Sequence, residues 1–137
     1  MNLFLDDFRS PIECVTYMKD AEYAMLDWKI VRSYDEFVWL VEDHYQETKG
    51  LPKLISFDHD LADEHYDPSM YTEKYSELYK GFKEKTGYHC AKWLTDFCLD
   101  NKIILPKFKV HSMNPAGGKN ITSLLTQFAK MQAEGSI

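Results

Sequence analysis

Acidic and histidine side chains occur in this sequence at three places where a short apolar run ends. The clusters are Asp6-Asp7 after NLFL, Asp58-His59-Asp60 after KLISF, and His111-Ser112 after KFKV. Carboxylates held close together repel one another, so they need a hard divalent cation, a shared proton or a basic neighbour. We expect Mg²⁺ if a metal binds, because it favours carboxylate and water oxygens, and its predicted ligands are Asp6, Asp7, Asp58 and Asp60. A lone Asp after a strand often only caps a turn, but these four acids together favour a functional site.

Two histidines, His59 and His111, belong to these clusters. Histidine titrates near neutral pH, so the two could serve as general acid and base, in either order. A single histidine at the end of a strand is more often a hydrogen-bonded structural residue. Two of them on separate strands, each beside an acid or a hydroxyl group, raise the case for catalysis or binding to about even.

Groups that could hold a phosphate lie in two places. The loop NPAGGKN contains Gly117 and Gly118, which would let backbone amides approach a ligand closely, and Lys119 as a point charge. Asn114 begins this loop, and Arg9 is the other candidate cation. The loop lacks the GxxxxGK[ST] pattern, and a Gly-Gly pair before a helix is often only a turn. An ion pair with the preceding acids is an equally good reading of Arg9.

The clusters must be positioned by strands and helices that alternate along the chain. Period-2 and continuous apolar runs predict strands at 2–5, 28–33, 53–57 and 107–111. Helical spacing predicts a helix at 34–47 with a Ser33–Glu36 capping box, another capped by Thr86 and ending near Asn101, and a last one from Ile121. We expect residues 8–27 to form a loop with a short helical turn, and residues 61–85 to form a partly helical insertion that could act as a lid.

This alternation predicts an α/β fold, a doubly wound and mainly parallel sheet with helices on both faces. The 137 residues suit a single domain, 1–137. In open α/β sheets the ligand crevice lies beyond the carboxyl ends of the strands, so the three clusters should meet there.

Composition limits the partners. A net charge of −6 argues against a surface that grips long nucleic acid, but it permits a small phosphate-bearing nucleotide or an RNA end. No run approaches the roughly 20 apolar residues of a membrane span, and the first residues do not resemble a signal peptide. The three cysteines, Cys14, Cys90 and Cys98, match neither a disulfide framework nor a metal site, so we expect reduced thiols in the cytoplasm.

Four segments taken in order, LDDFRSP, ISFDHDL, TGYHCAKWL and HSMNPAGGKNI, resemble the cyclic-phosphate processing receiver domain family over nearly the whole chain. The resemblance implies a receiver-like (flavodoxin-like) fold and a role in processing cyclic phosphate ends, in RNA repair or in conflict between phage and bacteria. It carries Asp6 and Asp7 onto an Mg²⁺-binding acid pair and Asp58 near the receiver phosphoacceptor. It also implies roles for His59, Asp60, His111, Ser112 and Asn114. The last strand ends in His-Ser, where a receiver would present a lysine, which counts against phosphorelay signalling.

Three functions remain open at this point. The first is a phosphoesterase that opens 2′,3′-cyclic phosphates or removes terminal phosphates from RNA or nucleotides, with Asp58, His59, His111 and Ser112 as candidate catalytic residues. The second is a non-enzymatic module that binds a phosphorylated nucleotide or a partner protein in the same pocket. The third, phosphoacceptance at Asp58, ranks last.

Overall fold

A computed structural model describes residues 1–62 and 85–137. Its sheet has four strands in the order β2-β1-β3-β4, and every neighbouring pair is parallel. The strands are β1 (Asn2–Leu5), β2 (Trp28–Val31), β3 (Leu54–Phe57) and β4 (Lys107–Val110). The prediction of a parallel sheet is confirmed. The predicted insertion at 61–85, and with it the lid, lies almost entirely outside the described residues.

Alternation of side chains divides the sheet into two faces. Leu3 and Leu5 of β1 pair in register with Ile55 and Phe57 of β3, and all four side chains are fully buried on one face. Phe4 of β1 points to the opposite face. The two central strands are therefore covered on both sides, as parallel sheets usually are.

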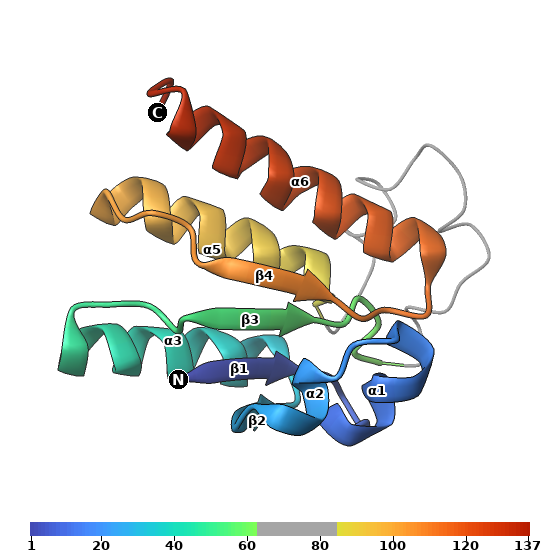
Figure 1. Cartoon of the computed structure of the whole chain (residues 1–137). Helices are drawn as coiled ribbons and strands as arrows, with labels where there is room; N and C mark the ends of the chain where they lie inside the picture. Colours follow the sequence, from blue (N-terminus) through green and yellow to red (C-terminus); the bar gives the residue numbers. More distant parts are fainter. Residues whose placement is uncertain (63–84) are drawn as a thin grey trace.

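Three long helices cover the first face: α3 (Tyr34–Thr48), α5 (Gly87–Asn101) and α6 (Pro115–Ala133) (Figure 1). The predicted caps are present, since Ser33 Oγ accepts a hydrogen bond from the Glu36 amide and Thr86 Oγ1 accepts from the Tyr88 and His89 amides. Because Ser33 is the N-cap of α3, β2 ends at Val31 rather than at Ser33.

Two short helices cover part of the second face, where we predicted mostly loop. They are α1 (Pro11–Met18) and α2 (Glu22–Met25), and they correct that prediction for residues 8–27. The N-terminus of α1 is set by Pro11 in its first turn and by reciprocal bonds between Ser10 and Glu13. Eight and four residues are too few for a clear helical period, but the layer buries Cys14 and Tyr23 against Phe4.

The last helix begins six residues earlier than Ile121, at Pro115. Asn114 is its N-cap and accepts a hydrogen bond from the Gly117 amide at 2.9 Å, while Pro115 supplies the fixed φ that suits the first helical position. Gly117, Gly118 and Lys119 therefore belong to the start of α6 and not to a loop before it.

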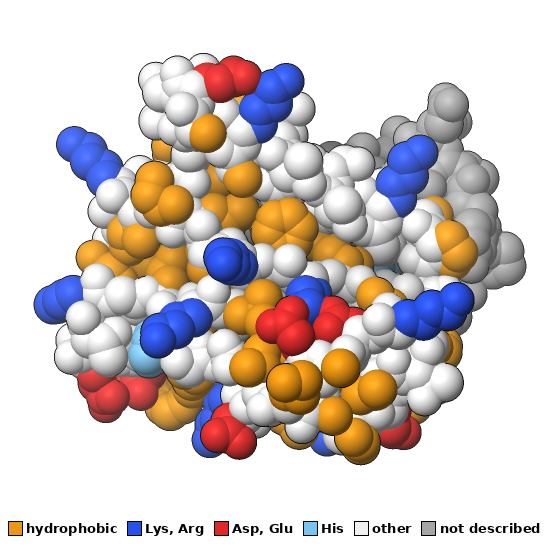
Figure 2. All heavy atoms as spheres, viewed as in Figure 1, with side chains coloured by type: hydrophobic (Ala, Val, Ile, Leu, Met, Phe, Trp, Pro, Cys, Tyr) orange, Lys and Arg blue, Asp and Glu red, His pale blue; other side chains and the backbone are white. Residues whose placement is uncertain are grey.

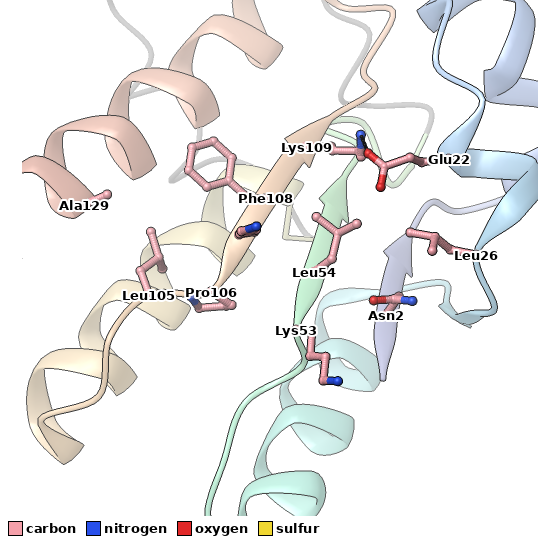
Figure 3. A pocket seen from close by; sticks show the side chains of 11 residues that line it. Asn2, Glu22, Leu26, Lys53, Leu54, Leu105, Pro106, Phe108, Lys109 and Ala129 are labelled. Carbon is pink, nitrogen blue, oxygen red and sulfur yellow. Dashed lines mark hydrogen bonds and ion pairs between the residues drawn. The ribbon is translucent and has the colours of Figure 1, made fainter.

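A hollow of about 680 Å³ lies beside the smaller layer and extends past β4 to Leu105, Phe108 and Ala129 (Figure 3). Figure 2 shows this side of the molecule, with lysine and acidic side chains close together over the sheet. Lys109 of β4 forms ion pairs there with Asp20 and Glu22. No candidate site residue from the sequence lines this hollow. Within the described ranges, no helix has the length and apolar character that a membrane span requires.

Candidate functional site

The carboxyl ends of β1, β3 and β4 bring together Asp6, Asp58 and His111. One potential ligand atom from each lies within 4.8 Å of the others, and all three side chains are at most 1% exposed. The structure thus joins one residue from each of the three sequence clusters, at the edge where parallel α/β sheets bind their ligands.

Asp6 is surrounded by hydrogen-bond donors. Its Oδ1 accepts from the backbone amides of Phe8 at 3.0 Å and Arg9 at 2.8 Å, and its Oδ2 lies 3.0 Å from Arg9 Nε and 3.2 Å from His111 Nε2. Burial on its own would raise the pKa of Asp6, but these bonds and the Arg9 charge outweigh it and lower the pKa to about 2. Asp6 is therefore a fixed anion at neutral pH.

Asp58 lies in the same cluster with far fewer partners. Its Oδ1 accepts from the His59 amide at 2.8 Å, whereas its buried Oδ2 accepts no hydrogen bond within the part of the chain that the structure describes. Arg9 Nη2 lies 3.3 Å from that Oδ2 as an ion pair. Burial, followed by the charge of Asp6, raises the pKa of Asp58 to about 7, although Arg9 opposes the shift. Asp58 can therefore gain or lose a proton near neutral pH.

Arg9 is the basic neighbour that lets these two acids coexist. Its guanidinium lies between them, and Nη1 also donates to the Tyr17 hydroxyl at 2.9 Å. The side chain is nearly buried, and its pKa is raised above the ordinary value because the charges of Asp58 and Asp6 outweigh desolvation. Arg32 fixes the loop by donating to the Arg9 carbonyl at 2.6 Å. Arg9 thus forms the ion pair with a preceding acid, Asp6, that the sequence suggested as one of its two roles.

The His111 ring is held on every side. It stacks on Phe4 with ring centroids 4.3 Å apart and an interplanar angle of 7°. Nδ1 lies 2.7 Å from Ser56 Oγ, which in turn lies 2.7 Å from the Tyr23 hydroxyl. The Tyr17 hydroxyl donates to the His111 carbonyl at 2.7 Å. Burial lowers the pKa of His111, although the hydrogen bond to Asp6 and the charge of Asp6 oppose this shift.

A second buried group contains His59, Asp60 and Asn114. Asp60 Oδ1 lies 2.7 Å from His59 Nδ1 and accepts from Asn114 Nδ2 at 3.1 Å. The start of α6 packs so closely here that a Cβ on Gly117 would lie 2.3 Å from His59 Cγ. Gly117 thus allows close packing against His59, and its predicted role in approaching a phosphate stays a prediction.

The remaining predicted site residues lie outside the close cluster of three. Ser112 Oγ accepts from the Asn114 amide at 3.1 Å and so forms part of the turn before α6. Lys119 is exposed on α6. Asp7 is half-buried, and burial together with the Asp6 charge raises its pKa. Their predicted roles in binding phosphate or metal stay predictions.

The donor set fits Mg²⁺ in part. Asp7 Oδ1 and Asp58 Oδ2 are buried carboxylate oxygens that lack a hydrogen-bond donor among residues 1–62 and 85–137, the kind of ligand this ion prefers. In contrast, both oxygens of Asp6 already accept hydrogen bonds. Asp60 contacts His59 and Asn114 through its Oδ1. Arg9 also supplies positive charge at the position between Asp6 and Asp58.

Sequence reasoning missed several residues that build the site. Tyr17 and Tyr23 lie in the segment predicted to be a loop with a short helical turn, and Ser56 is the polar exception within the apolar run LISF. Gly87 begins α5, and a Cβ there would lie 1.7 Å from the Asp58 carbonyl oxygen. The signals were present: a serine facing inward on a buried strand needs a partner, and a glycine after a helix cap allows close approach.

Comparison with known proteins agrees with the geometry. The family model of the cyclic-phosphate processing receiver domain matches residues 1–127, which include every strand and the whole of the buried site. No curated protein and no solved structure gives a significant match. The four-stranded parallel sheet with flanking helices is consistent with a receiver-like, flavodoxin-like fold. The chain therefore belongs to the cyclic-phosphate processing receiver domain family.

Proposed function

We propose that this chain is a phosphoesterase that opens 2′,3′-cyclic phosphates at the ends of RNA or on nucleotides. The observation that carries the proposal is Asp58 Oδ2, a buried carboxylate oxygen without a hydrogen-bond donor in the described structure, beside the Arg9 guanidinium. A base next to a cation suits attack on a phosphate, because the cation attracts the phosphate oxygens while the base accepts a proton from water.

In this reaction one water is consumed. Its oxygen forms a new bond to phosphorus as Asp58 accepts its proton, and the bond from phosphorus to one ribose oxygen breaks. The released ribose hydroxyl takes up a proton, which balances the one that Asp58 received. A pKa of about 7 keeps Asp58 able to accept a proton at neutral pH and to return it afterwards.

This assignment changes the roles that we predicted for the histidines. Both ring nitrogens of His111 are engaged, one by Ser56 and the other by Asp6. We therefore assign His111 to holding the Asp6 carboxylate in place, and Asp58 to accepting and returning the proton. His59 is bound to Asp60 in the neighbouring group. For Mg²⁺, we propose Asp7 as a ligand, because Asp58 must stay free to accept a proton, and the ion would supply further positive charge to phosphate oxygens. RNA repair and conflict between phage and bacteria are proposed settings, on the family resemblance alone.

A binding module without turnover is the second candidate. The observation that favours it is burial: Arg9 is 7% exposed and Asp58 1%, which leaves little room for a reacting group. Phosphoacceptance at Asp58 stays third. The only lysines on β4 are Lys107 and Lys109, and Lys109 forms ion pairs with Asp20 and Glu22.

The test incubates the purified chain, in Mg²⁺ or in EDTA, with RNA oligonucleotides that end in 2′,3′-cyclic or linear phosphate. Mass spectrometry then resolves the products. Asp58→Asn should lose about 100-fold or more of the turnover, because it cannot accept a proton. Asp96→Asn is the matched control, since Asp96 is an exposed acid paired with Lys92 on α5.

Ring opening by the wild type and by Asp96→Asn, with its loss in Asp58→Asn, would support the phosphoesterase. Loss of turnover in EDTA would show that the reaction also needs a metal ion. Unchanged RNA that nevertheless binds tightly would favour the module, and a mass gain on Asp58 with a small phosphodonor would favour phosphoacceptance.

A further inference from the structure

We infer that the outer edge of β4 is a docking site for an extended peptide strand of another protein, one in which acidic and apolar side chains alternate. β4 is the last strand in the sheet order β2-β1-β3-β4, so one of its edges has no strand beside it within residues 1–62 and 85–137. An open edge presents unpaired backbone N–H and C=O groups, which can pair with an added strand. The inference does not depend on the proposed phosphoesterase activity.

The pairing of β4 with β3 shows which backbone groups point outward. The His111 amide donates to the Phe57 carbonyl at the end of the parallel β3, at 2.9 Å. Because the backbone groups of successive residues in a strand point to opposite sides, the N–H and C=O of Lys109 also face β3. Those of Phe108 and Val110 therefore point to the open edge, where β4 has no neighbouring strand among the described residues.

The hollow of about 680 Å³ follows this open edge (Figure 3). Its lining includes the successive residues Lys107, Phe108 and Lys109. In a strand, the two lysine side chains point to one face of the sheet and the phenylalanine between them to the other. One hollow can meet both faces of a strand only by passing around its free edge. Figure 3 shows this arrangement, with Phe108 on the side of Ala129 of α6 and Lys109 on the side of Glu22.

The lysine face of β4 favours acidic side chains in the added strand. Lys107 and Lys109 project from this face, and Lys53, just before β3, also lines the hollow. Lys109 already pairs with Asp20 and Glu22, so carboxylates do settle at this position. Lys53 and Lys107 are exposed and form no ion pair with the part of the chain that the structure describes. Acidic residues of a docked strand would supply the carboxylates that these two lysines lack.

The opposite face favours apolar side chains. Phe108 and Val110 of β4, and Phe128 and Ala129 of α6, are partly buried side chains packed against the main core. Phe108 and Ala129 also line the hollow, together with Leu105. Figure 2 shows hydrophobic side chains at the surface between α6 and the sheet. Apolar residues of a docked strand would cover this surface, and the residues between them would face the lysines.

A peptide suits this edge better than a second copy of the chain or a nucleic acid does. In an antiparallel pair of two β4 strands, the lysines of both copies would lie on one face and oppose each other, which is destabilising. Lysines on an edge strand guard against such self-pairing, and the same charges attract an acidic partner. A phosphate backbone carries acceptors and no donors, so it cannot satisfy the outward carbonyls of Phe108 and Val110 as peptide N–H groups do.

The first experiment measures binding to the full chain by fluorescence anisotropy. The probe is a labelled synthetic peptide of about eight residues in which glutamate and valine alternate, and the matched peptide has lysine in place of each glutamate. The glutamate peptide should bind and the lysine peptide should not. Lys107→Glu and Lys53→Glu should each weaken binding of the glutamate peptide about tenfold, because an attraction becomes a repulsion. Lys29→Glu is the matched control, an exposed lysine on the other edge strand, β2, and should leave binding unchanged.

Amide hydrogen exchange, followed by NMR on the wild-type chain, reads the backbone pairing directly. The amides of Phe108 and Val110 should exchange at least about tenfold more slowly when the glutamate peptide saturates the chain, and those of β2 should not change. Absence of binding up to about 1 mM peptide would overturn the inference. Binding that leaves these two amides unprotected would also overturn it, because charge attraction alone would then explain the complex.

Two further results would assign the edge to another occupant and so overturn the inference. One is a single-stranded RNA that binds more tightly than the peptide and is weakened equally by Lys107→Glu. The other is a chain that sediments as a dimer, with the amides of Phe108 and Val110 already protected before peptide is added.

Discussion

Asp58 and Asp60 are two residues apart and almost equally buried, at 1% and 2% exposure, yet their surroundings differ sharply. Asp60 meets the side chains of His59 and Asn114. Asp58 has one oxygen with no hydrogen-bond donor in the described structure, and it shares Arg9 with a second acid. Burial alone therefore does not mark a reactive acid. What matters is whether the donors around it satisfy the charge that burial penalises.

The largest expected effect separates these two acids by activity. On the RNA-end assay, Asp58→Asn should lose about 100-fold or more of the turnover, whereas Asp60→Asn should stay within about tenfold of the wild type. Asp60→Asn should instead cost about 1–2 kcal/mol of unfolding free energy, because neutral hydrogen bonds replace charged ones. Equal losses of turnover would mean that both acids are needed for the reaction, and would support Asp60 as the metal ligand that we predicted.

The next effect concerns pH and stability. The pKa of Asp58 is raised from 3.8 to about 7 in the folded chain, so the stability due to its proton is fully present below about pH 3.8 and is lost as the pH rises through about 7. The loss is about 4 kcal/mol at most. The pKa of Asp6 shifts the other way, from 3.8 to about 2. The stability that the Asp6 carboxylate contributes to the fold is therefore lost only as the pH falls below about 4.

Urea unfolding of the wild type and of Asp58→Asn between pH 4 and 8 measures this effect. The difference in unfolding free energy between the two chains should favour the wild type most at pH 4 and decline toward pH 8. A difference that stays constant across the range would mean that Asp58 titrates normally, and that its environment resembles that of an exposed acid.

A smaller effect tests the packing of the second group. Gly117→Ala would place a Cβ 2.3 Å from the His59 ring, and we expect it to cost about 1–3 kcal/mol. Gly118→Ala is the matched control in the same helical turn, where the nearest atom is Ser112 Cβ at 3.5 Å. That control should be neutral or up to about 1 kcal/mol stabilising, because alanine favours helix. Thermal unfolding of both variants measures how tightly the start of α6 packs against His59.

The smallest effect concerns Lys119. This residue is exposed at the start of α6 and would act on a phosphate only as a distant charge. Lys119→Ala should raise KM a few-fold at low salt, leave kcat unchanged, and lose even this effect at about 1 M salt, where charges are screened within about 3 Å. A large fall in kcat would instead place Lys119 among the groups that contact the phosphate.

The sequence was informative where a residue type and its position on a strand decide the outcome. Apolar runs followed by Asp6, Asp58 and His111 predicted a parallel sheet whose edge gathers them, and the structure brings these three together. It was uninformative where the partner is distant in the chain. No local pattern could show that Tyr23 would reach Ser56, or that the Arg9 guanidinium would lie between two carboxylates, because both depend on how the strands and the short helices pack.

The α1–α2 layer contributes the Tyr17 and Tyr23 hydroxyls that hold His111, but it is made of an eight-residue helix and a four-residue helix around a small core. Elements with so few buried contacts open by local unfolding at a lower free energy than the rest of a domain. The amides of α1 and α2 should therefore exchange with deuterium before those of α5 and α6. Activity should likewise disappear in urea before the sheet unfolds, because the site is dismantled when its weakest layer detaches.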